Sequence, residues 1–193
     1  MRTRGARRVR ERHGAASIRR LADRDGSIEA ALDDVAQIDK IGTFPSIEVG
    51  ATLRSLELSV LDGVDPRTRV RIEAGAGILA TDYVRMVRLR QDAIRFFEQS
   101  FGNNEAFVLP TTPIRAPLLA SVAEHAAFHE LNGLVLRNPR VANLLDCPSI
   151  SLPLPLEGLP VGLMLIGRRN ADRRLLEIAA SVEALLRGHL HAA

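Results

Sequence analysis

Residues 146–186 constrain the fold of this 193-residue chain more than any other segment. Residues 149–152 indicate a short strand that stops at Pro153, and three breakers follow it: Pro155, Gly158 and Pro160. Residues 161–166 (VGLMLI) are almost all apolar, which is typical of a strand covered on both faces. Gly162 inside this run predicts the close approach of another backbone.

A helix is expected after this second strand. Gly167 ends the strand, and either Asn170 or Asp172 can cap a helix. The apolar positions of that helix recur at helical spacing: Leu175, Ile178, Ala179, Val182, Leu185 and Leu186. A buried strand followed by an amphipathic helix predicts a layered α/β domain.

The same segment resembles a known family. CPSISLP, GLPVGLMLIGR and DRRLLEIAASVE occur together and in the order found at the C-terminal end of the amidase signature family. The resemblance implies part of the amidase-signature fold, an α/β architecture with a mixed sheet of short strands flanked by helices. Members of this family hydrolyse carboxamides with a Ser, a second Ser and a Lys.

Helical patterns dominate the first half of the chain. A helix is predicted from Ser27, followed by a short strand over residues 38–44. Asp65-Pro66 starts a long helix that should run to about residue 101, with a kink near Gly75 and Gly77. Within that helix, Tyr83 and Arg90 stand where the resembled family has a Tyr and an Arg.

Three residues are candidates for contact with a substrate. The strand 107–109 ends in a Pro-Thr turn, and the resemblance places this turn near the substrate pocket, which makes Thr111 and Thr112 candidates. The alternative is that both hydroxyls only satisfy backbone groups of the turn. Asn143 corresponds to an Asn that precedes the prolyl-Ser strand in the family. It follows a turn predicted at Asn138-Pro139 and lies in a short apolar helix over residues 141–145.

The catalytic residues that the resemblance requires are not found in this sequence. There is no Gly-Gly-Ser-Ser run, which would hold the nucleophile and the oxyanion. Lys40 is the only lysine and is interpreted as a surface residue. Ser149 and Ser151 form the nearest serine pair, but they lie in a strand outside the catalytic region. The resemblance covers roughly the last 125 to 165 residues of the chain, and no catalytic residue is assigned within them.

Other catalytic or metal-binding schemes have weaker support. Cys147, the only cysteine, could pair with His125 or His129, but a small buried thiol is the better interpretation. The two histidines are four residues apart and would share a helix face, yet they lack the internal Glu of H-E-x-x-H. We therefore predict neither a metal site nor a cofactor.

The charge of the chain is unevenly distributed. Residues 1–26 hold nine arginines against three acidic residues, whereas the rest of the chain is mildly acidic. We expect a basic flexible tail over 1–26 and, from the resemblance, the C-terminal portion of an amidase-type α/β domain over 27–193. Clustered arginines can bind nucleic acid, but no aromatic residue accompanies them, so a solvated tail is favoured. No apolar run approaches a membrane span, and a single cysteine is compatible with the cytoplasm.

The sequence is compatible with three functions. The first is a C-terminal fragment or subunit of an amidase-type hydrolase that is inactive alone and depends on a separate N-terminal catalytic half to act on a small amide. The second is a non-catalytic structural or binding protein that retains the half-fold, including as a homo-oligomer. The third, ranked last, is a nucleic-acid binder that uses its arginine-rich tail.

Overall fold

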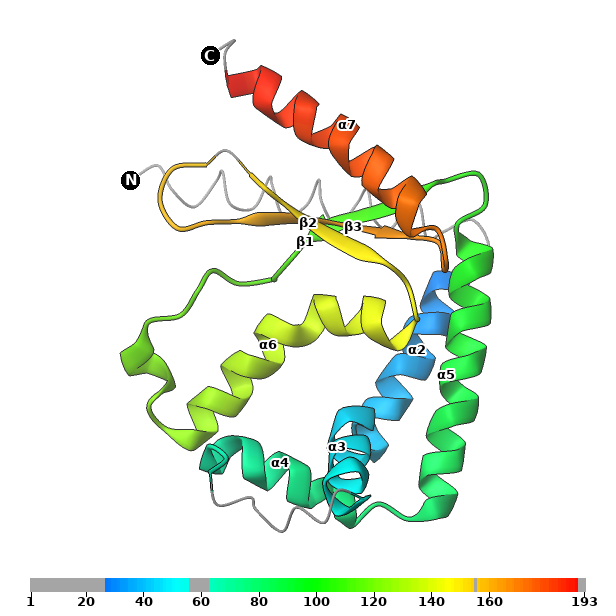
Figure 1. Ribbon diagram of the computed structural model, residues 1–193, viewed down its shortest axis with the longest axis vertical. Coiled ribbons are helices and arrows are strands. Elements are labelled where there is room, and N and C mark those ends of the chain that lie inside the picture. The colour runs from blue at the N-terminus through cyan, green and yellow to red at the C-terminus, as the bar shows by residue number, and fades with distance from the viewer. Residues whose placement is uncertain (1–26, 56–62, 155, 191–193) are drawn as a thin grey trace.

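A computed structural model describes residues 27–55, 63–154 and 156–190 (Figure 1). The basic segment 1–26 lies outside these residues, so both the predicted tail and the domain boundary beside it stay predictions. No helix in the described part of the chain has the length and apolar composition needed to cross a membrane.

Three strands form one antiparallel sheet: β1 (Ala106–Pro110), β2 (Ser149–Pro153) and β3 (Gly162–Gly167), in the order β1-β3-β2. A parallel pair needs a crossover of about a dozen residues or more, and the loop between β2 and β3 is shorter than that. These two strands consequently pair as a hairpin. The α/β class is confirmed, but the three described strands are all antiparallel rather than mixed.

The central strand β3 is buried on both faces, as predicted. Met164 and Ile166 face the larger core, whereas Leu165 faces a smaller core beneath α7 (Asp172–Leu190). The expectation for Gly162 was wrong in detail, because side-chain hydroxyls rather than a backbone lie closest to it. Thr111 and Ser151 occupy the space that a Cβ at this position would need.

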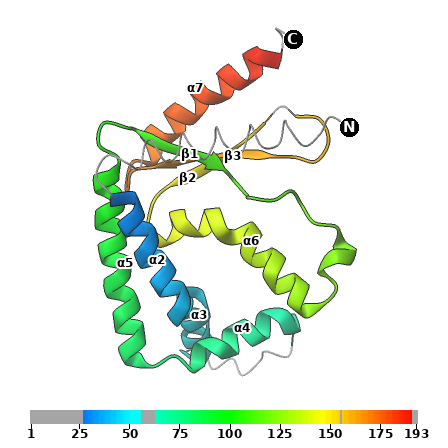
Figure 2. The same ribbon diagram turned by 180° about the vertical axis from the view of Figure 1, so that it is seen from behind.

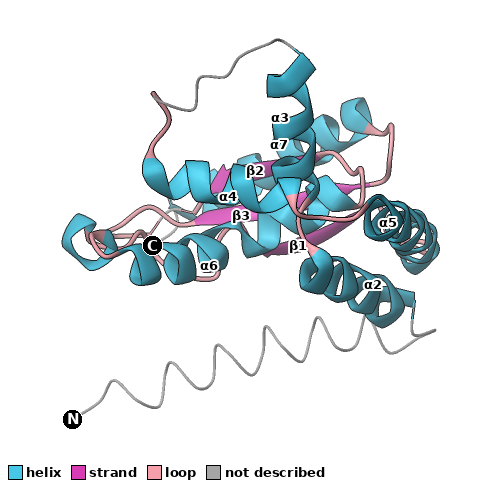
Figure 3. Cartoon of the chain, turned by 90° about the horizontal axis from the view of Figure 1, so that it is seen from below, coloured by secondary structure: helices cyan, strands magenta, loops and turns pink. Residues whose placement is uncertain are grey.

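Helices cover the two faces of the sheet unequally. The amphipathic helix α7 lies across one face, and Leu175 and Ala179 pack against β2 and β3. The other face looks toward α2 (Ser27–Ile41), α5 (Ala80–Ser100) and α6 (His125–Leu144), as Figures 1 and 2 show. Figure 3 shows α2 and α5 packed side by side.

Aromatic contacts join α5 to the sheet in the larger core. The rings of Phe97 and Phe101 lie 5.0 Å and 4.7 Å from the ring of Phe107 on β1, measured between centroids. Helix α2 adds a buried stripe at helical spacing, formed by Ala31, Val35 and Ile38. This core fixes the direction of α5, from which side chains of the candidate site project.

The helix predicted from Asp65 is two helices. Asp65 caps α4 (Pro66–Ala76) as expected, because its side chain accepts a 2.9 Å hydrogen bond from the backbone N–H of Arg67. The chain then turns at Gly77, and α5 begins at Ala80. The kink expected near Gly75 and Gly77 is therefore a complete break. Gly75 is buried against the backbone of α3 (Phe44–Ser55), which leaves no room for a side chain.

Two other local predictions were wrong. The strand expected over residues 38–44 does not exist, because α2 continues to Ile41 and α3 begins at Phe44. The turn expected at Asn138-Pro139 lies inside α6, which changes direction along its length (Figures 1 and 2). A proline removes one hydrogen bond of a helix. Here Asn138 stabilises this part of α6 by donating a 2.7 Å hydrogen bond to the carbonyl of Pro110.

Candidate functional site

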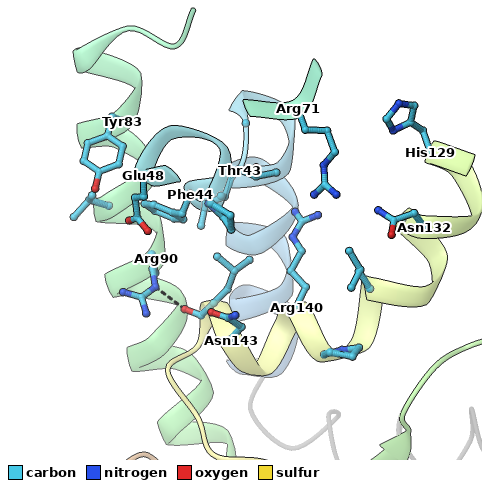
Figure 4. A pocket seen from close by; sticks show the side chains of 18 of the residues that line it. Thr43, Phe44, Glu48, Arg71, Tyr83, Arg90, His129, Asn132, Arg140 and Asn143 are labelled. Atoms are coloured by element: carbon cyan, nitrogen blue, oxygen red, sulfur yellow. Dashed lines mark hydrogen bonds between the residues drawn. The ribbon is translucent and has the colours of Figure 1, made fainter. Parts of the chain in front are cut away.

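The candidate site is a cavity of about 790 Å³ bounded by residues of five helices (Figure 4). This volume lies within the roughly 300–1,000 Å³ that small-molecule sites occupy. Its labelled polar side chains come from the α2–α3 turn and from α3, α4, α5 and α6: Thr43, Glu48, Arg71, Tyr83, Arg90, His129, Asn132, Arg140 and Asn143.

One face of α6 supplies the floor and one wall of the cavity. His129, Asn132, Leu136, Arg140 and Asn143 follow one another at intervals of three or four residues, so they lie on one side of a helix. The opposite walls come from α4 and α5. Because α6 continues through Pro139, although it changes direction along its length, Arg140 and Asn143 line the same cavity as His129 and Asn132.

Arg90 holds the C-terminal end of α6 in place. Its Nε donates a 2.8 Å hydrogen bond to the carbonyl of Leu144, drawn as a dashed line in Figure 4, and its Nη2 lies 3.8 Å from Asp146. Asp146 adopts a positive φ of 58° and also pairs with Arg169 at 2.7 Å. The guanidinium of Arg90 thus stabilises a helix end and is not free for a ligand.

Arg140 and Arg71 approach the cavity from opposite helices. Arg140 forms an ion pair with Asp39 on α2, and burial lowers the pKa of its guanidinium below the usual value. Arg71 projects from α4 toward Arg140 in Figure 4. It forms no hydrogen bond or ion pair with any residue that the structure describes. The two guanidinium groups make this end of the cavity positive.

The structure separates the three predicted substrate contacts. Asn143 lines the cavity, whereas Thr111 and Thr112 lie beyond β1, outside it. The hydroxyls of Thr111 and Ser151 share a 2.5 Å hydrogen bond between β2 and the segment after β1. Thr112 donates to the carbonyl of Ile114 at 2.8 Å, as the alternative interpretation of a turn residue expects. A substrate contact by any of the three stays a prediction.

The remaining candidate residues do not come together as a catalytic group. Cys147 is a partly buried thiol, and burial raises its pKa to about 12. Lys40 is exposed near the end of α2. Among the described residues, no three of the His, Cys, Asp and Glu side chains are placed to hold a metal ion. The two histidines share α6, but only His129 lines the cavity.

Sequence reasoning missed Arg71, Asn132 and Arg140. The spacing of residues 129, 132, 136, 140 and 143 was present in the sequence, but the turn predicted at Asn138-Pro139 interrupted it. Without that predicted turn, the spacing would have indicated one continuous polar face of a helix. Nothing in the sequence near Arg71 indicates that α4 lies opposite α6.

Comparison with known proteins identifies the family. The model of the family described as Amidase matches residues 29–176, and the chain belongs to this family. It is 31% identical over 160 residues to a fatty acid amide hydrolase of Medicago truncatula, covering 78% of this chain and 26% of the relative. It is 25% identical over 181 residues to the 2-amino-5-chloromuconic acid deaminase of Comamonas testosteroni, covering 90% of this chain and 39% of the relative.

A solved structure supports the same assignment. A crystal structure of an amidase superposes with a TM-score of 0.59 at 25% identity, covering 73% of this chain and 33% of the amidase. The chain spans 26% and 39% of the length of the two relatives above. These matches assign the chain to the family, and each of them covers less than half of the longer protein.

Proposed function

We propose that this chain is the C-terminal portion of an amidase-type carboxamide hydrolase and hydrolyses no amide by itself. The observation that carries this proposal is a family match over residues 29–176 in a sequence without the Ser-Ser-Lys set. Carbon–nitrogen bond hydrolysis in this family requires an activated serine. We infer that this serine and its lysine are supplied by a separate N-terminal catalytic half.

The positions of Lys40 and of the serines on β2 support the proposal that the catalytic serine and lysine lie in a separate half. Lys40 is exposed on α2, and Ser151 is bonded to Thr111. Neither arrangement pairs a serine with a neutral lysine, as the chemistry requires. The chain instead contributes a three-stranded sheet, its helices and the cavity of Figure 4. A small amide becomes a substrate only when the catalytic half is present.

Exposed apolar side chains support a partner. Leu118 and Leu119, at the start of the short helix η1 (Leu119–Val122), are 79% and 88% exposed, and Leu79 before α5 is 65% exposed. Adjacent apolar side chains exposed together, as Leu118 and Leu119 are, can mark a surface that another chain covers. The partner we propose is the catalytic half, and a homo-oligomer is the competing occupant. We place both in the cytoplasm, in keeping with the single cysteine.

The decisive experiment is complementation. The purified chain is assayed for ammonia release from short aliphatic, aromatic and fatty-acid amides, alone and with the N-terminal half of a related amidase. We expect no release above buffer from the chain alone and clear release from the mixture. The control mixture carries a catalytic half in which its own lysine is replaced.

Two results would overturn the proposal. Turnover by the chain alone that survives Lys40→Ala would reveal a catalytic site within this chain. A monodisperse chain that melts cooperatively and gives no activity with any catalytic half would instead be a self-sufficient structural or binding protein. Size-exclusion chromatography with light scattering distinguishes such a monomer from a homo-oligomer.

A further inference from the structure

We propose that the end of the cavity between α4 and α6 binds a small oxyanion, a carboxylate or a phosphate group, held by Arg71 and Arg140. This inference does not depend on the proposed hydrolase function, because the binding residues all lie in this chain.

The cavity has more positive than negative lining groups. Among the described residues that line it, Arg71, Arg90 and Arg140 are basic and Glu48 is the only acidic one. Glu48 lies on the side of Phe44 and Tyr83 in Figure 4, away from Arg71. Arg90 is engaged with the end of α6. The positive charge that remains is concentrated where α4 faces α6.

Two guanidinium groups that point toward one another repel unless negative charge lies between them. Arg140 has Asp39 as its ion-pair partner, but Asp39 belongs to α2 and does not line the cavity. Arg71 has no ion-pair partner in the part of the chain that the structure describes. An anion between the two arginines would offset the repulsion and would give Arg71 an acceptor.

Two further polar groups complete the arrangement. Asn132 and His129 lie on the face of α6 that lines the same cavity as the arginines (Figure 4). Within the described residues, the side chain of Asn132 has no hydrogen-bond partner, and the ring of His129 meets the ring of Phe128 edge to face. The amide of Asn132 can donate to an oxyanion, as the planar fork of a guanidinium can with two parallel hydrogen bonds.

The test is a titration of the full chain at constant ionic strength, followed by ¹H–¹⁵N NMR of the Asn132 side-chain amide and the Arg71 Nε–H. Separate arms use malonate, inorganic phosphate and chloride. We expect saturable shifts with malonate or phosphate and none with chloride. The arm that saturates at the lower concentration identifies the natural group as a carboxylate or a phosphate.

Two variants of α4 make the assignment specific. Arg71→Gln should weaken binding by about tenfold, because it removes a bidentate charge-assisted contact. Arg69→Gln is the matched control, because it removes the same charge from the same helix at a residue that pairs with Glu73 and does not line the cavity. Arg69→Gln should leave the affinity within about twofold, since exposed charges act weakly through solvent.

A third variant separates weaker anion binding from loss of folding. Asn132→Ala retains every charge and should weaken binding by several-fold, and its thermal unfolding should match that of the wild-type chain. The proposal is overturned if no anion gives saturable shifts. It is also overturned if Arg71→Gln and Arg69→Gln weaken binding equally, because the anion would then respond only to overall charge.

Discussion

Replacing Gly75 by alanine tests the close packing of α3 on α4. Glycine-to-alanine changes within helices usually stabilise a protein by roughly 0.5–1 kcal/mol, because they restrict the unfolded chain. At Gly75 we expect the opposite sign. A Cβ there would overlap the carbonyl of Ser46 and lie 2.8 Å from the backbone nitrogen of Ile47. Both obstacles are backbone atoms, so α3 and α4 would have to separate.

The expected magnitude follows from these opposing effects. Overpacking costs about 1–3 kcal/mol, and the helical gain offsets up to about 1 kcal/mol of that cost. We therefore expect Gly75→Ala to lower the free energy of unfolding by about 1–2 kcal/mol and the melting temperature by about 2–8 °C. Urea titration and calorimetry measure both quantities.

Gly133→Ala is the matched control for this prediction. Gly133 is an exposed glycine inside α6, and a Cβ there would meet nothing within 4 Å. Alanine at this position should raise the free energy of unfolding by roughly 0.5–1 kcal/mol. If Gly75→Ala also stabilises the protein, then α3 does not pack on α4 as the structure shows, and the reasoning fails.

Three further predictions concern single side chains. Arg90→Gln removes the hydrogen bond to α6 and should lower the free energy of unfolding, measured by urea titration, by about 1–2 kcal/mol. The control Arg88→Gln changes an exposed arginine of the same helix and should leave this free energy unchanged. Equal losses in the two variants would contradict the role of Arg90. The raised pKa of Cys147, about 12, should make iodoacetamide alkylation at pH 8 at least about 100-fold slower in the native than in the unfolded chain. The stability linked to this thiol should fall as the pH rises above 9.0, and similar native and unfolded alkylation rates would refute the burial. Hydrogen bonds from Arg67 hold the pKa of Asp65 at about 2, so its stabilising effect should be lost as the pH falls below 3.8, and an NMR titration midpoint near 3.8 would refute it.

Elements with a complete local pattern were predictable from the sequence. The apolar run around Met164 and the helical spacing of Leu175 and Ala179 correctly predicted β3 and α7. Asp65-Pro66 correctly placed the start of α4. In each case the signal lies within a few residues, because it comes from a continuous apolar run, helical periodicity or capping chemistry.

Elements that depend on distant contacts were not predictable in the same way. Residues 38–44 carry β-branched and aromatic side chains that favour a strand, but burial of Ile38 beside Ala31 and Val35 extends α2 instead. Pro139 is tolerated inside α6, where the side chain of Asn138 bonds to a carbonyl 28 positions earlier in the chain. Propensity alone cannot include such a tertiary contact.

The candidate site follows from the same continuity of α6. A helix that ended at Asn138 would separate His129 and Asn132 from Arg140 and Asn143, and no cavity face would result. Because the helix continues, its polar face lies opposite Arg71, and the end of that face is held by Arg90. The residues that identify the family, on β2, β3 and α7, lie on the other side of the molecule from this face (Figure 1). The family match over residues 29–176 includes the cavity helices, but the segments first recognised in the sequence lie elsewhere, so any ligand has to be determined from the cavity itself.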